Sequence, residues 1–244
     1  MNKLEKNVGA MLEPAWLYAD LGEDIKQNPL KILAETVKKY NCRGAVIHLG
    51  DDLVKIYYKW GCEKIVAVID FPYGRGGGHK KKEEALFANY PGVIGLDVVI
   101  NLWALQNKDW STIKEDLRAV KKSCPGKEIK VICQMPFIWQ YHREIILPLL
   151  YVLADYGVNV IKDWTTINNF SKPIKTDIET RVEYTAYLRK MIDKNKLPLL
   201  IKVAGEVNKD NVVSFKEAGA DIFGISCQKT QGIFETLVKY SKKS

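Results

Sequence analysis

Two lysines and one aspartate occupy strand-like apolar runs, where charged residues are unusual. Lys162 and Lys202 each close such a run, and Asp97 lies within a third, over residues 95–101. A buried ammonium loses its hydration, and both burial and a neighbouring cation lower the pKa of a lysine toward a nucleophilic free amine. Two strand lysines with one acid therefore suggest carbonyl chemistry through a Schiff base.

The elements that would position these residues alternate along the whole chain. Strands are expected at Asn7–Leu12, Gly44–His48, Lys64–Ile69, Gly95–Asn101, Ile129–Gln134, Val158–Lys162, Leu199–Ala204 and Asp221–Ile225. Helices are expected near residues 22–40, 52–61, 79–90, 110–123, 142–156, 176–194, 208–218 and 230–243. The later strands are continuously apolar, which is typical of a parallel sheet covered on both faces. Eight β/α units predict an α/β fold, a (β/α)8 TIM barrel made by one domain over residues 1–244, with a doubly wound sheet as the alternative.

The barrel gives the three charged residues a common location. Active sites of such barrels lie at the carboxyl ends of the strands, where Lys162 and Lys202 stand. A single strand lysine is often a structural salt-bridge partner. Two of them with Asp97 favour catalysis because burying three charges is costly. Pro148 contradicts the helix expected over 142–156 and suggests a kink or a break there.

Composition excludes several classes of function. The net charge of +8 is spread over lysine-rich helix faces, which predicts a solvated surface and not a nucleic-acid partner. Five scattered cysteines without a C-x-x-C pair and three dispersed histidines indicate neither a disulfide framework nor a metal site. No run is long enough to span a membrane and no signal peptide is recognisable, so a cytoplasmic location is expected.

Several segments resemble one family in order and spacing, from about residue 8 to the end. They are Val66–Gly74, Gly95–Leu105 with Asp97, Ile129–Ile132 with Lys130, Val160–Lys162, Ile201–Gly205 and Ala218–Ser226. Together they resemble the deoxyribose-phosphate aldolase family. The resemblance implies a cofactor-independent class I aldolase, a lyase that reversibly cleaves 2-deoxyribose 5-phosphate to acetaldehyde and glyceraldehyde 3-phosphate. It also implies a small-molecule aldehyde or sugar-phosphate partner and suggests a homodimer.

The same resemblance implies roles for individual residues. Lys162 would form the imine, Lys202 would depress the pKa of Lys162, and Asp97 would move protons together with water. Substrate binding is implied for a further set of residues, namely Lys130, Thr165, Gly205, Gly224 and Ser226.

Other positions depart from the family pattern. Asp163 and Trp164 follow Lys162, and Glu206 replaces a glycine, so an acid and a bulky indole would crowd the site of a phosphate. A further family aspartate near the N-terminus has no clear counterpart around Val8–Glu13. Two alternatives therefore stay open: a related lysine-dependent aldolase for a different carbonyl substrate, phosphorylated or not, and a non-catalytic barrel used as a binding or scaffold protein.

Two segments have open interpretations. The glycine-rich stretch Gly74–Lys82 matches no nucleotide motif, but it could offer backbone N–H groups to an anion near Arg75, or be a solvated loop. The aromatic stretch Met135–His142 could wall a pocket, form a subunit contact or pack in the core.

Overall fold

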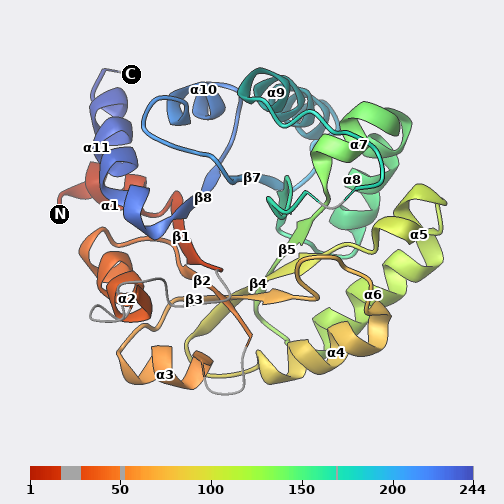
Figure 1. Cartoon of the computed structure of the whole chain (residues 1–244), viewed down its shortest axis with the longest axis horizontal. Coiled ribbons are helices and arrows are strands. Elements are labelled where there is room, and N and C mark those ends of the chain that lie inside the picture. Colours follow the sequence, from red (N-terminus) through yellow and green to blue (C-terminus); the bar gives the residue numbers. More distant parts are fainter. Residues whose placement is uncertain (18–28, 50–52, 169, 244) are drawn as a thin grey trace.

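The protein is a closed barrel of eight parallel strands surrounded by helices (Figure 1). The computed structural model describes residues 1–17, 29–49, 53–168 and 170–243. The strands are β1 (Leu12–Trp16), β2 (Ala45–His48), β3 (Ile65–Ile69), β4 (Val93–Val99), β5 (Glu128–Ile132), β6 (Val160–Lys162), β7 (Leu200–Ala204) and β8 (Ile222–Ser226). Because β1 pairs in parallel with both β2 and β8, the predicted (β/α)8 barrel is confirmed and the doubly wound sheet is excluded.

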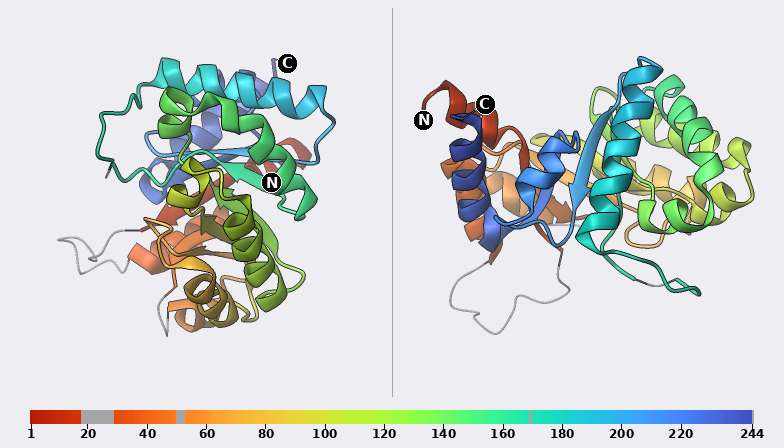
Figure 2. Two further views of the ribbon diagram at one scale, coloured as in Figure 1. Left: turned by 90° about the vertical axis from the view of Figure 1, so that its right-hand side faces the viewer. Right: turned by 90° about the horizontal axis from the view of Figure 1, so that it is seen from above.

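The helices form the outer layer around the strands, and loops lie at the two ends of the barrel (Figure 2). The α-helices are α1 (Lys3–Gly9), α2 (Pro29–Lys39), α3 (Leu53–Lys59), α4 (Gly77–Phe87), α5 (Leu102–Gln106), α6 (Trp110–Ser123), α7 (Met135–Tyr141), α8 (Ile146–Asp155), α9 (Ile178–Lys194), α10 (Val212–Glu217) and α11 (Thr230–Ser241). Two 3-10 turns are η1 (Arg143–Ile145) and η2 (Cys227–Lys229). Residues 22–28 and 52, the beginnings of two expected helices, lie outside the described residues. Within the described part of the chain, no helix has the length and apolar character needed to cross a membrane.

Local sequence signals explain where several helices begin. The side chain of Asp109 accepts the backbone N–H of Thr112 at the start of α6, as its N-cap position predicts. Asp177 does the same for Thr180 at the start of α9. Pro148 lies in the first turn of α8, where a missing N–H breaks no helical hydrogen bond. The single helix expected over 142–156 is divided into η1 and α8, so a break does occur there, before Pro148 and not at it.

The first predicted strand is also wrong. Asn7 belongs to α1, which starts with a capping box in which Asn2 and Glu5 each accept the other's backbone N–H. The strand β1 begins only at Leu12. Short helices were not predicted at α1, α5 and α7. The aromatic stretch over Met135–His142 is mainly α7, and Trp139 is buried in the core, so core packing is the correct interpretation for it.

Candidate active site

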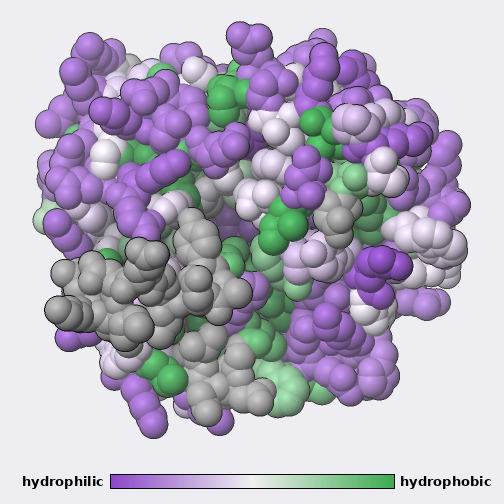
Figure 3. Space-filling model, in the orientation of Figure 1, coloured by the Kyte–Doolittle hydropathy of each residue, from purple (hydrophilic) through white to green (hydrophobic). Residues whose placement is uncertain are grey.

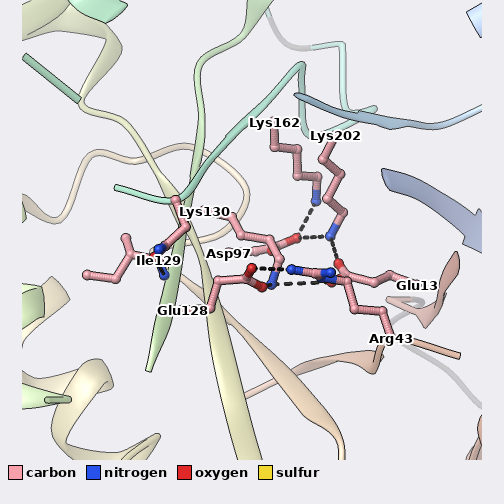
Figure 4. A network of polar contacts seen from close by, with 9 residues as sticks. Glu13, Arg43, Asp97, Glu128, Ile129, Lys130, Lys162 and Lys202 are labelled. Carbon is pink, nitrogen blue, oxygen red and sulfur yellow. Dashed lines mark hydrogen bonds and ion pairs between the residues drawn. The ribbon is translucent and has the colours of Figure 1, made fainter. Parts of the chain in front are cut away.

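Lys162, Lys202 and Asp97 come together inside the barrel, close to the carboxyl ends of β6 and β7 (Figure 4). Lys162 and Lys202 are direct neighbours in the register of β6 and β7. Their side chains both reach Asp97 on β4: the Nζ of Lys162 lies 2.8 Å from Asp97 Oδ2, and the Nζ of Lys202 lies 2.6 Å from the same oxygen. The sequence prediction that these three residues share one site is thus matched by their geometry.

Burial makes the two lysines electrostatically different. Burial lowers the pKa of Lys162, and the ammonium of Lys202 lowers it further, so that it lies below its ordinary value in spite of Asp97. Burial also acts on Lys202, but the carboxylates of Asp97 and Glu13 outweigh it and raise the pKa of Lys202. Asp97 is held ionised because the nearby ammonium groups outweigh its desolvation and lower its pKa. Lys202 is therefore the proton-bearing cation and Lys162 the readier free amine.

Glu13 is a residue that sequence reasoning missed. It comes from β1, is fully buried, and forms an ion pair with Lys202 while its other oxygen lies 3.3 Å from Lys130 Nζ. It stands in the segment where the family aspartate had no clear counterpart, and it supplies a carboxylate there. The available signal was an acid between the apolar residues Leu12 and Pro14 at the start of a strand.

Further charges continue the network away from the two lysines. Lys130 lies 2.7 Å from Glu128, and Arg43 contacts both Glu128 and Glu13. The network then contains four cations and three carboxylates, namely Arg43, Lys130, Lys162 and Lys202 with Glu13, Asp97 and Glu128. Loss of one proton from one lysine would make it neutral, which favours a free amine in a buried cluster.

A cavity of about 440 Å³ opens next to Lys162 and Lys202. Thr165, Gly205, Gly224 and Ser226, four of the residues implied in substrate binding, line it together with the two lysines. Lys130 does not: it is fully buried and engaged with Glu13 and Glu128. The space-filling view shows the barrel face hollowed near its centre (Figure 3).

The backbone geometry and close contacts explain why two positions in the cavity wall are glycines. Gly205 has φ +78°, and a Cβ there would lie 2.1 Å from Thr166 Cγ2. A Cβ at Gly224 would lie 2.9 Å from Ala204 Cβ and 3.1 Å from Lys202 Cε. Both positions therefore keep the wall of the cavity close to the lysines and to the loop after β6.

Asp163 and Trp164 do not crowd the cavity, which corrects the expectation drawn from their types. Asp163 is buried and its carboxylate lies 2.7 Å from Arg181 of α9, while it also accepts the Tyr184 hydroxyl. The Trp164 indole donates to the carbonyl of Ala204. These contacts hold both side chains outside the cavity, and neither of them lines it. Glu206 does line it and is exposed there.

The glycine-rich stretch is partly helical. The helix α4 begins at Gly77, and Lys81 is buried, with ion pairs of 2.7 Å to Asp70 and 3.1 Å to Asp116. Arg75 is exposed in the loop before α4 and lines a second cavity. A uniformly solvated loop is therefore the wrong description of residues 74–82. Among the described residues, no three His, Cys, Asp or Glu side chains gather into a group that could hold a metal ion.

The sequence is similar to curated deoxyribose-phosphate aldolases. Those of Thermotoga petrophila and Thermotoga maritima are 39% identical over 75 residues, 31% of this chain, so the match spans only 30% of the length of these relatives. The deoxyribose-phosphate aldolase of Mycoplasmopsis pulmonis is 24% identical over 208 residues, which cover 84% of this chain and 88% of the relative. No protein-family model matches the chain.

Solved structures share the fold. The aldolase QR15 has a TM-score of 0.76 at 22% identity, and the match covers 100% of this chain and 99% of QR15. The deoxyribose phosphate aldolase of Aeropyrum pernix, described as tetrameric, has a TM-score of 0.73 at 20% identity over 98% of this chain and 92% of its own. The fold and the site thus define the class, a (β/α)8 barrel with paired buried lysines. The chain is similar to deoxyribose-phosphate aldolases in sequence and in fold, which confirms the resemblance found in the sequence.

Proposed function

We propose that the chain, over residues 1–244, acts as one class I aldolase domain that reversibly cleaves 2-deoxyribose 5-phosphate to acetaldehyde and glyceraldehyde 3-phosphate. The observation that carries this proposal is the contact of Lys162 and Lys202 with one oxygen of Asp97 at the wall of a cavity. Lys202 is also paired with Glu13, whereas Lys162 has only the oxygen of Asp97 that it shares with Lys202. The second lysine makes one amine easier to deprotonate, as imine chemistry requires.

Lys162 is the nucleophile in this proposal. Its lone pair attacks the aldehyde carbon of acetaldehyde, and the resulting carbinolamine loses water to form a protonated imine. Loss of a proton from the adjacent carbon gives an enamine, which adds to the aldehyde of the acceptor. Water then releases the product and restores the amine. Its lowered pKa supports this role for Lys162, because attack needs the free amine.

Asp97 moves protons during these steps. Its Oδ2 holds both ammonium groups, whereas its Oδ1 is buried and has no hydrogen-bond partner in the part of the chain that the structure describes. A buried carboxylate oxygen without a partner is suited to accept a proton from a water or a substrate hydroxyl. Lys202 supplies the fixed positive charge, and Lys130 balances the carboxylates of Glu13 and Glu128 without touching substrate.

The remaining cavity residues hold the acceptor. Thr165, Gly205, Gly224 and Ser226 line the same cavity as Lys162, which supports a role in substrate binding. Glu206 at this cavity opposes a phosphate dianion, because like charges repel. Whether the acceptor carries a phosphate therefore needs a test of its own.

The test is cleavage of 2-deoxyribose 5-phosphate by the purified chain, with acetaldehyde measured by its reduction through alcohol dehydrogenase and NADH. The wild-type chain should release acetaldehyde and Lys162→Met should not, while Lys209→Met, at an exposed position, should retain activity. Cleavage of unphosphorylated 2-deoxyribose alone would identify the unphosphorylated alternative. Release of acetaldehyde from neither compound by a folded wild-type chain would contradict the proposal.

The homodimer and the cytoplasmic location stay predictions.

A further inference from the structure

A second cavity, of about 630 Å³, lies beside the one that holds Lys162. Its lining includes three aromatic residues, one arginine and amide side chains, contributed by the segments that follow β3, β4, β5 and β6, with α5 among them. Among the lining residues are Tyr73, Arg75, Asn101, Trp103, Gln134 and Phe170. Ile167 lines both cavities, so the two are adjacent at the barrel mouth.

The wall between the cavities is the residue pair Gln134 and Thr165. Gln134 lines the second cavity and Thr165 the first. The Gln134 amide donates to Thr165 Oγ1 at 3.1 Å and its carbonyl accepts the Thr165 backbone N–H at 3.2 Å. Gln134 itself has φ +56°, a conformation that few residues with a side chain adopt. The strained backbone conformation therefore lies at Gln134, in the wall between the two cavities.

The second cavity is positively charged. Of the described residues that line it, none is acidic, and Arg75 is the one with a permanent charge. Arg75 has no hydrogen-bond or ion-pair partner within the described residues. A free guanidinium offers a fork of donors that matches the oxygens of a phosphate. Asn101 adds a donor, since its Oδ1 is already used by the N–H of Ala104 and its NH2 group remains.

The cavity also offers flat apolar surfaces. Trp103 is 68% exposed and Tyr73 is 51% exposed, which is a large exposure for residues that prefer burial. Phe170 is stacked on Phe137 with ring centroids 5.1 Å apart, so its position is fixed. Aromatic side chains of this kind stack on rings of ligands.

We propose that this second cavity binds a phosphomonoester that carries a flat ring, with Arg75 and Asn101 on the phosphate and Trp103 on the ring. A simple anion would not need the exposed aromatics, and a neutral ring would not need the unpaired arginine. Binding at this site can be tested whether or not the aldolase assignment holds, because Lys162, Lys202 and Asp97 do not line the cavity.

The experiment is calorimetric titration of the full chain with adenosine 5′-monophosphate, adenosine and inorganic phosphate. Wild type should bind the monophosphate more tightly than either of the other two. Arg75→Gln should weaken binding of the monophosphate by about tenfold or more, because a hydrogen bond to a charged group is lost. Binding of adenosine should be nearly unchanged. Trp103→Ala should weaken binding of both adenosine and the monophosphate by about fivefold or more, because the ring on which they stack is removed.

Two control variants match the changes in type. Lys82→Gln removes one exposed positive charge from α4 and Phe87→Ala removes an aromatic ring that is 67% exposed, and neither residue lines the cavity. Both should bind the monophosphate as wild type does. No binding up to millimolar concentrations, or equal binding by wild type, Arg75→Gln and Trp103→Ala, would overturn the proposal.

Two sources share this ligand chemistry: the distal end of a larger acceptor substrate and a separate nucleotide-like ligand. They differ in kinetics. If the monophosphate raises the KM of the acceptor in wild type but not in Arg75→Gln, the cavity continues the acceptor site. If it binds through Arg75 without changing that KM, the cavity holds a separate ligand.

Discussion

Lys162 and Lys202 contact one and the same oxygen of Asp97, at 2.8 Å and 2.6 Å. Two ammonium groups on one oxygen repel each other, so protonation of one opposes protonation of the other. Lys202 has the additional carboxylate of Glu13, and Lys162 has none at that distance among the described residues. The asymmetry assigns the proton to Lys202 and the free amine to Lys162.

The first prediction concerns the pH dependence of imine formation. The rate should rise with pH through the pKa of Lys162, which lies below the ordinary 10.5. Lys202→Met removes the neighbouring cation that lowers this pKa, so the rising limb should move to higher pH. The measurement is the rate of reductive trapping of acetaldehyde against pH. Lys209→Met is the control, and a limb that stays in place or moves to lower pH would show that Lys202 does not tune Lys162.

The second prediction concerns stability. Folding lowers the pKa of Lys162, so its ammonium costs stability at pH values below the folded pKa, and this cost disappears as pH rises through 10.5. Lys162→Met should therefore raise the free energy of unfolding at pH 7, and the gain should shrink toward pH 10.5. Lys202→Met should lower stability, because the pKa of Lys202 is raised by folding and its contribution is lost only above 10.5.

Urea unfolding of the three proteins at several pH values measures both effects. A Lys162→Met variant less stable than wild type at pH 7, or a gain that grows with pH, would contradict the electrostatic assignment. Such a trade between stability and chemistry is common at active sites.

The third prediction concerns the pair formed by Asp163 and Arg181. Asp163→Asn leaves the fully buried guanidinium of Arg181 without its counter-charge. Breaking a buried ion pair costs about 3–5 kcal/mol, so the free energy of unfolding should fall by about that amount. Asp210→Asn, at an exposed position, should change it by less than about 0.5 kcal/mol. The double variant with Arg181→Met should recover part of the loss, and full additivity would argue against the pair.

The fourth prediction concerns Gly205. Gly205→Ala places a Cβ 2.1 Å from Thr166 at φ +78°, so the loop after β6 must shift. Gly126→Ala is the matched control, since φ there is +77° and no atom lies within 4 Å of the added Cβ. Both should lose more than about 1 kcal/mol from backbone strain. The Gly205 variant should in addition lose aldolase activity, and equal activity of the two variants would show that the contact with Thr166 is unimportant.

The barrel was predictable because its strands are continuous apolar runs and its helices carry cap residues such as Asp109. Both signals are local and follow from burial on two faces and from unsatisfied helix N–H groups. The short helices were not predicted because a periodic apolar pattern is hard to recognise over so few residues. The helix α1 has only seven residues, and its capping box competes with an apolar pattern that also suits a strand.

The lysine pair was predictable because a strand lysine is conspicuous, whereas its partners were harder to find. Glu13 lies 189 residues from Lys202 in sequence, and only the closure of β1 onto β8 brings the two together. The types of Asp163 and Trp164 suggested crowding, but which face of the strand end they occupy depends on the packing of α9. Asp163 pairs with Arg181 of α9, which lies 18 residues later in the sequence, so this pairing has no local signal.

The most direct test of the central claim is sodium borohydride trapping with acetaldehyde, followed by intact-mass and peptide mass spectrometry. We expect a two-carbon adduct on Lys162 that is absent in Lys162→Met and still forms, on Lys162, in Lys209→Met. An adduct on Lys202 in place of Lys162, or no adduct on the folded wild-type chain, would contradict it.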